Sequence, residues 1–153
     1  MLMKKLLFTV LLLAGTVAAV VAQSNSAVSW KYSAKKIADK TYEVHMTATI
    51  TGNWHLYSQD GGDGPVSTTF KFTSNPLLTL DGKVKEVGNL KKVFEEAFGS
   101  EVRYYEKTVD FVQVVKVKGK AKTALAGTVE FMVCNDKECL PPSEVPFKIA
   151  IGG

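Results

Sequence analysis

Side chains that commonly bind zinc are scarce in this sequence. Its 153 residues include two cysteines, Cys134 and Cys139, and two histidines, His45 and His55. A four-ligand zinc site would need all of them, and a pair of cysteines separated by four residues matches the usual zinc spacings poorly. We therefore expect neither a metal site nor another bound cofactor.

A large excess of charge of one sign is also missing. The chain has 19 basic and 15 acidic residues, and its formal net charge of +4 includes Lys4 and Lys5 near the N-terminus. This near balance does not indicate a nucleic-acid partner or attachment to an anionic membrane surface. The glycine-rich stretch 61–65 lacks the spacing of a phosphate-binding loop, and the sequence contains no internal repeat or low-complexity tract.

A long apolar run occurs only at the N-terminus. Lys4 and Lys5 precede the run 6–21, and the small residues that end at Ala22 are typical of a signal-peptide cleavage site. An uncleaved anchor is the alternative, but the run is short for a membrane span and no charged flank follows it. We expect residues 1–22 to be a cleaved signal peptide and residues 23–153 to be one exported domain without membrane insertion. No cysteine lies near the cleavage site to carry a lipid anchor.

The remainder of the chain has the pattern of a β-protein. Residues 41–51 alternate between apolar and polar side chains, as a half-buried strand does, and His45 falls on the polar face. Further strands are expected at 27–33, 66–73, 77–80, 84–87, 102–106, 109–117, 124–133 and 145–151. Many short strands without a long helical pattern predict an all-β sandwich.

Three local patterns qualify this prediction. Asp81-Gly82 is a hairpin turn signal between two short strands. The alternation within 109–117 changes phase near Val112, which indicates a bulge or a strand buried on both faces. Apolar residues at helical spacing within 89–98 predict a short amphipathic helix that Gly99 would end.

Both cysteines flank one short polar loop between two strand-like runs, 129–133 and 145–151. Facing residues of an antiparallel pair come close enough for a disulfide. Closing so short a loop stabilises a fold by only ~2 kcal/mol, against ~4.7 kcal/mol for a loop of about 100 residues. The spacing alone leaves a redox-active disulfide and a structural hairpin disulfide equally open.

Disulfide exchange needs a thiolate, an accessible sulfur and a leaving thiol. No helix N-terminus is expected at Cys134 to favour its thiolate. Lys137 would favour the thiolate, whereas Asp136 and Glu138 would oppose it. An exchanging pair in this loop would therefore react mainly when it is docked to a partner that supplies the right geometry.

Three segments resemble the family of the periplasmic N-terminal domain of the thiol-disulfide interchange protein DsbD. The segment 129–142, with its two cysteines and the following Leu-Pro-Pro, is similar to the family's active-site hairpin, although its loop is one residue shorter than in the best-known member. Residues 52–57 resemble the family's Gly-aromatic-aromatic-Leu-Tyr segment. Residues 96–102 resemble its cap loop of acidic, aromatic and glycine residues.

The resemblance implies an immunoglobulin-like β-sandwich with a cap loop over the cysteine hairpin. It implies that Cys134 and Cys139 exchange disulfides in the periplasm, without a cofactor, as a protein-disulfide oxidoreductase would. The electron donor would be a membrane thiol-disulfide reductant, and the acceptor a thioredoxin-like periplasmic protein. The alternative is an immunoglobulin-like binding or adaptor module in which the disulfide is a fixed brace.

The resemblance also implies which residues surround the sulfurs. Trp54, His55 and Tyr57 would line the site; otherwise Trp54 and Tyr57 would be core residues and His55 would be solvated.

Phe98 is the expected shielding residue of the cap, with Phe94 second because a helical turn would bring it to the same face. Glu96 is the expected acidic neighbour, able to steer a basic partner surface.

Overall fold

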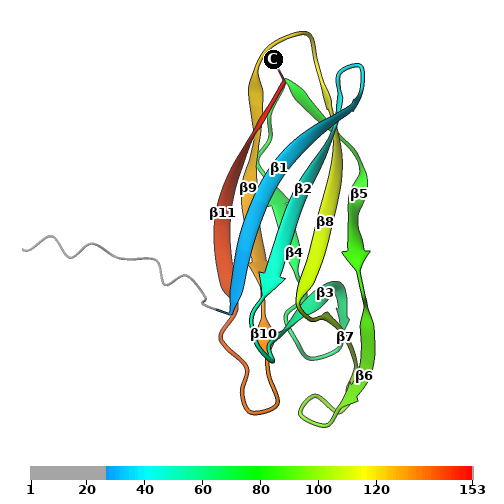
Figure 1. The fold of residues 1–153 in the computed structure, drawn as a ribbon, viewed down its shortest axis with the longest axis vertical. Coiled ribbons are helices and arrows are strands. Elements are labelled where there is room, and N and C mark those ends of the chain that lie inside the picture. The colour runs from blue at the N-terminus through cyan, green and yellow to red at the C-terminus, as the bar shows by residue number, and fades with distance from the viewer. Residues whose placement is uncertain (1–26, 153) are drawn as a thin grey trace, which may run out of the picture.

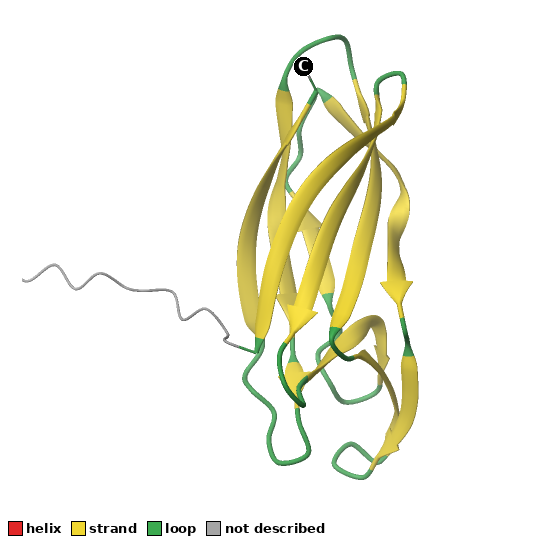
Figure 2. Ribbon diagram, in the orientation of Figure 1, coloured by secondary structure: helices red, strands yellow, loops and turns green. Residues whose placement is uncertain are grey.

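The computed structural model describes residues 27–152, and these residues form strands, turns and loops without a helix (Figures 1 and 2). The predicted all-β sandwich is confirmed. The expected signal peptide at 1–22 lies outside the described residues. Within residues 27–152, no helix exists that is long and apolar enough to cross a membrane.

The strands form three antiparallel sheets. The first sheet contains, in spatial order, β1 (Val28–Ala38), β2 (Thr41–Ile50), β8 (Thr108–Val117) and β5 (Leu78–Gly88). The second contains β11 (Ser143–Ile151), β9 (Thr123–Phe131) and β4 (Thr69–Phe72). The third contains β10 (Val133–Cys134), β3 (His55–Gly62), β7 (Ser100–Tyr105) and β6 (Lys91–Glu95).

The main core lies between the first two sheets. The predicted alternation of residues 41–51 is confirmed on β2, where Val44, Met46 and Ala48 are fully buried. Trp30 of β1 contacts Phe111 of the same sheet and Phe131 of the facing sheet, with ring centroids 5.8 and 5.5 Å apart. Aromatic rings from both layers therefore fill the space between them. The third sheet lies at the lower end of the view in Figure 1, where it continues the sandwich.

The predicted hairpin at Asp81-Gly82 is wrong, because residues 78–88 form the single strand β5. Its first half pairs with the end of β8 and its second half with the start of β8, with a register shift between Asp81 and Lys85. The buried Gln113 of β8 donates to the carbonyl oxygens of Asp81 and Gly82, at 3.3 and 3.2 Å. The turn signal thus marks a bulge. The phase change expected near Val112 does not occur on β8, because every second residue from Val109 to Val117 is buried and β8 pairs with β2 without a register shift. The bulge lies in β5 instead, and Val112 is buried on the opposite face of β8.

The predicted helix at 89–98 is also wrong. Residues 91–95 form strand β6, which pairs with β7 from Lys91↔Tyr104 to Glu95↔Ser100. A tight turn follows, in which the N–H of Gly99 donates to the carbonyl oxygens of Glu95 and Glu96. So short an apolar run fits helical and strand spacing alike, and pairing with β7 decides between them.

Candidate functional site

The two cysteines lie where β10 leaves the third sheet. Cys134 pairs with His55 of β3, and an isolated β-bridge joins Cys134 to Cys139. The two cysteines form a disulfide with their Cα atoms 4.0 Å apart, as the hairpin predicted. Asn135 closes the loop between them, because its side-chain oxygen accepts the N–H groups of Lys137 and Glu138 at 2.8 and 2.9 Å.

The two sulfur-bearing residues differ in exposure. Cys134 is 2 % exposed and packs with Tyr57 and Val102 in a small cluster separate from the main core. Cys139 is exposed to solvent. A thiol or disulfide from outside the molecule can therefore reach Cys139 far more readily than Cys134.

An open pocket of about 460 Å³ lies beside the disulfide. Its walls are the cysteine hairpin, the start of β3 and the turn that follows β6. The lining residues are His55, Glu95, Glu96, Ala97 and the hairpin residues 134–139. The structure thus brings the predicted site residues Glu96 and His55 to the two cysteines.

His55 is the centre of a buried polar group within this wall. Its Nε2 atom lies 3.1 Å from the hydroxyl of Tyr57 and 3.2 Å from Oε1 of Glu95. The Tyr57 hydroxyl donates to Oε2 of Glu95 at 3.0 Å, and the imidazole stacks on the ring of Tyr104, with centroids 4.1 Å apart. At 6 % exposure, His55 is not the solvated residue of the alternative interpretation.

The surroundings shift the pKa values of His55 and Tyr57 in opposite directions. Burial lowers the pKa of His55, and the negative charge of Glu95 acts against that shift. Burial also raises the pKa of Tyr57, and Glu95 adds to it. At neutral pH the pair therefore presents a neutral imidazole and a neutral phenol beside a carboxylate.

Two members of this group, Glu95 and Tyr104, were not predicted from the sequence. If residues 91–95 are taken as a strand, alternation of the side chains places Glu95 on the same face as Lys91 and Val93. The paired strand β7 then supplies Tyr104 opposite Lys91. The helical interpretation of 89–98 concealed this signal.

The other predicted site residues lie at different distances from the pocket. Tyr57 is fully buried in the same cluster as Cys134. Trp54 packs against the main core. Phe94 lies on strand β6 and is 65 % exposed. Because this segment is a strand, the helical turn that would have brought Phe94 to the face of Phe98 does not exist.

Phe98 is partly buried and packs against the cluster of Tyr57, Val102 and Cys134, while Ala97 lines the pocket itself. The ring of Phe98 meets Tyr57 edge to face at 6.1 Å. Gly64 also lies against this side chain, because an added Cβ at Gly64 would fall 2.5 Å from Phe98 Cδ1. A direct shielding role of Phe98 remains a prediction, and its position indicates that it supports the turn.

Replacing Gly64 by alanine should destabilise the protein by about 2 to 3 kcal/mol, which chemical denaturation would measure. Gly64 has a φ of +115°, and the new methyl group would collide with Phe98. Gly119→Ala is the matched control, since Gly119 has a φ of +79° and open space around it; about 1 kcal/mol is expected there. Equal losses in the two variants would show that Gly64 and Phe98 are not packed together.

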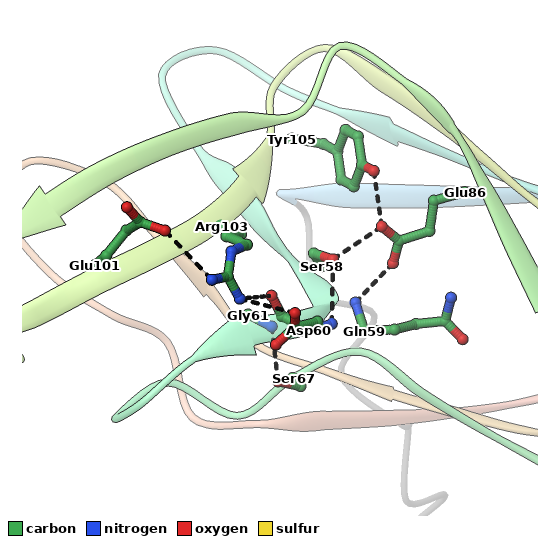
Figure 3. A network of polar contacts seen from close by, with 9 residues as sticks. All are labelled: Ser58, Gln59, Asp60, Gly61, Ser67, Glu86, Glu101, Arg103 and Tyr105. Carbon is green, nitrogen blue, oxygen red and sulfur yellow. Dashed lines mark hydrogen bonds and ion pairs between the residues drawn. The ribbon is translucent and has the colours of Figure 1, made fainter.

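A second polar network ties the third sheet to the first (Figure 3). Glu86 of β5 accepts hydrogen bonds from the hydroxyl of Ser58 at 2.8 Å, the N–H of Gln59 at 2.6 Å and the hydroxyl of Tyr105 at 2.7 Å. Ser58 and Gln59 belong to β3 and Tyr105 to β7. One carboxylate therefore joins the strands that carry the pocket to the sandwich.

The second histidine lies far from this chemistry in the fold. His45 of β2 bonds to Asp110 of β8 at 2.7 Å, on the first sheet. Among residues 27–152, no group of three or more histidine, cysteine, aspartate or glutamate side chains is arranged to hold a metal ion.

Residues 21–150 match the sequence profile of the family described as the thiol:disulfide interchange protein DsbD, N-terminal. No curated protein matches the chain.

Solved structures with a similar fold include the N-terminal periplasmic domain of ScsB from Proteus mirabilis, 15 % identical with a TM-score of 0.58. This match covers 84 % of the present chain and 47 % of that one, so the chain spans about half of that relative. The reduced N-terminal domain of DsbD from Neisseria meningitidis is 19 % identical with a TM-score of 0.55, over 83 % and 87 % of the two chains. These similarities agree with the predicted immunoglobulin-like sandwich.

Proposed function

Because the chain belongs to the family of the N-terminal domain of the thiol:disulfide interchange protein DsbD, we propose that it exchanges disulfides through Cys134 and Cys139. The observation that carries this proposal is the position of the pair, with an exposed Cys139 bonded to a buried Cys134 at the edge of an open pocket. A structural brace would not need one of its two cysteines to be exposed beside an open pocket.

The exchange follows from this asymmetry. In the reduced protein, the Cys139 thiolate attacks a disulfide of the partner, and one partner sulfur leaves as a thiolate. Cys139 and the other partner sulfur are then joined. The Cys134 thiolate next attacks Cys139, so that the Cys134–Cys139 disulfide forms and the second partner sulfur leaves. The partner disulfide has gained two electrons, and the cysteine pair has lost two.

The family suggests the two ends of the electron path. The donor would be a membrane thiol-disulfide reductant, and the acceptor a thioredoxin-like protein in the periplasm. Residues 1–22 would direct export as a signal peptide, and residues 23–153 would form the working domain. The acidic residues at the rim, Glu96 among them, favour a partner whose surface around its own cysteines is basic.

The turn after β6 is the part of the proposed cap that adjoins the pocket. We expect Phe98→Ala to speed alkylation of the reduced pair, because the turn loses its support, and to cost about 2 kcal/mol of stability. The matched variant Ala97→Phe places a ring at the pocket wall and should slow alkylation. Stopped-flow alkylation together with thermal melting would measure both effects. Unchanged alkylation in both variants would show that the turn does not control access.

The direct test of exchange uses the reduced protein and an oxidised thioredoxin-like domain. After acid quenching and alkylation, mass spectrometry should show the loss of both cysteine thiols matched by two new thiols on the partner. Oxidised glutathione should react more slowly, because it cannot dock. A cysteine pair that stays reduced in the presence of excess oxidised partner would contradict the proposal and favour the adaptor interpretation.

A further inference from the structure

We propose that His55 accepts the proton of the buried Cys134 thiol when the mixed disulfide is resolved. This proposal rests on the exchange function proposed above and names a residue that performs one step of it. Cys134 and His55 are direct partners across strands β10 and β3. Both also line the same pocket.

The step needs a local acceptor because Cys134 is withdrawn from water. At 2 % exposure and packed against Tyr57 and Val102, its thiol has little contact with bulk solvent. Only the thiolate is a competent nucleophile, and apolar surroundings favour the thiol over the thiolate. Directly opposed residues on one face of an antiparallel pair have Cβ atoms about 4.5 to 5.5 Å apart, so the side chains of His55 and Cys134 start from neighbouring positions at the wall of the same pocket.

The hydrogen bonds around His55 leave one ring nitrogen free to accept a proton. The Tyr57 hydroxyl donates its hydrogen to Glu95, so the phenol oxygen can only accept from His55. Glu95 is likewise an acceptor. Both partners of Nε2 are therefore acceptors, and Nε2 carries the ring hydrogen. The other nitrogen, Nδ1, then holds the lone pair, and no described residue donates a hydrogen bond to it.

The proton and electron changes of the step balance. The Cys134 thiol gives its proton to Nδ1 of His55 and becomes a thiolate, which attacks Cys139. The bond between Cys134 and Cys139 forms as the bond between Cys139 and the partner breaks. The departing partner thiolate takes up a proton, from the imidazolium or from water, and His55 returns to its neutral form.

The groups that face His55 favour a neutral imidazole before the proton transfer and stabilise the imidazolium after it. Burial keeps the imidazole neutral before the transfer, as the direction of its pKa shift indicates. Glu95 on β6 stabilises the imidazolium formed afterwards, and Glu106 and Asp136 act in the same sense from farther away. The neutral rings of Tyr57 and Tyr104 complete the enclosure without adding charge.

The test measures Cys134 alone, in a Cys139→Ser background, through the pH dependence of its alkylation by iodoacetamide. General-base assistance contributes about 10² to 10⁴ in rate. We expect His55→Gln to slow alkylation at pH 7 by about a hundredfold. The rate should recover as the pH is raised, because hydroxide then removes the thiol proton without help from the imidazole. His45→Gln, which changes the other histidine on a different sheet, should leave the whole profile unchanged.

Several outcomes would overturn the proposal. A loss of rate in His55→Gln that is the same at every pH would show a purely structural role. An unchanged profile would show that another group takes the proton, even if wild-type exchange stands. If His55→Gln does not fold, Glu95→Gln provides a second test, because it keeps the imidazole and removes the charge that stabilises the imidazolium. Glu95→Gln should slow alkylation about tenfold at pH 7, and the rate should again recover at higher pH. An alkylation rate that Glu95→Gln leaves unchanged would contradict the role of His55. Failure of exchange in the wild-type protein would instead refute the function itself.

Discussion

Replacing Cys139 by serine is expected to abolish exchange, whereas replacing Cys134 by serine should leave the protein locked to its partner. Cys139 is the exposed residue of the pair, so its loss removes the sulfur that meets the partner. Cys134 is buried and acts second, so its loss stops the reaction at the mixed disulfide. Non-reducing gel electrophoresis with an oxidised thioredoxin-like domain would show the covalent complex in Cys134→Ser only.

Stability provides the control for this comparison. The disulfide closes a loop with a sequence separation of 5, so its loss should cost no more than ~2 kcal/mol. The double serine variant should therefore remain folded, and urea denaturation would measure the change. A complex that forms through Cys134 and not through Cys139 would reverse the assigned order of attack. A double variant that is unfolded at room temperature would show that the disulfide is a structural brace.

Replacing Glu86 by alanine is expected to cost about 3 to 5 kcal/mol, the largest stability loss that we predict. The carboxylate accepts three hydrogen bonds, and two of the donors, Ser58 and Tyr105, are each only 3 % exposed. Each buried group left without a partner costs about 1 to 3 kcal/mol. Chemical denaturation would measure the loss, and hydrogen exchange should show β3 and β7 opening first.

A second acidic residue of the same network serves as the control for Glu86. Glu101 pairs with Arg103 at 3.3 Å, but its side chain is 54 % exposed (Figure 3). Exposed ion pairs contribute about 0 to 1 kcal/mol, so Glu101→Gln should be nearly neutral. Similar losses in Glu86→Ala and Glu101→Gln would show that Glu86 does not join the two sheets in the way described.

The cysteine hairpin could be predicted from the sequence because its signals are local. Two apolar runs, a short polar loop and a cysteine at each end of it are all contained in 129–151. The strand 41–51 could equally be predicted, because its alternation is regular. The resemblance of 52–57 to a segment of a known family also indicates, from the sequence alone, that His55 and Tyr57 lie near the site.

The polar partners of the site could not be predicted because they depend on pairing between distant strands. Glu95 reaches His55 only because 91–95 pairs with β7 as a strand, and its short apolar pattern is compatible with a helix as well. Glu86 meets Ser58 and Tyr105 across two sheets, which no local pattern encodes. The turn signal at Asp81-Gly82 failed for the same reason, since β8 continues along both halves of β5.

The midpoint potential of the Cys134–Cys139 pair tests the central claim most directly. The protein would be equilibrated in a series of dithiothreitol or glutathione redox buffers, and the free thiols would be trapped by alkylation and counted by mass spectrometry. A working pair should titrate within the range of thioredoxin-like proteins, between about −270 and −120 mV. A potential below about −300 mV, or a pair that cannot be reduced without unfolding, would identify a structural disulfide and contradict the exchange function.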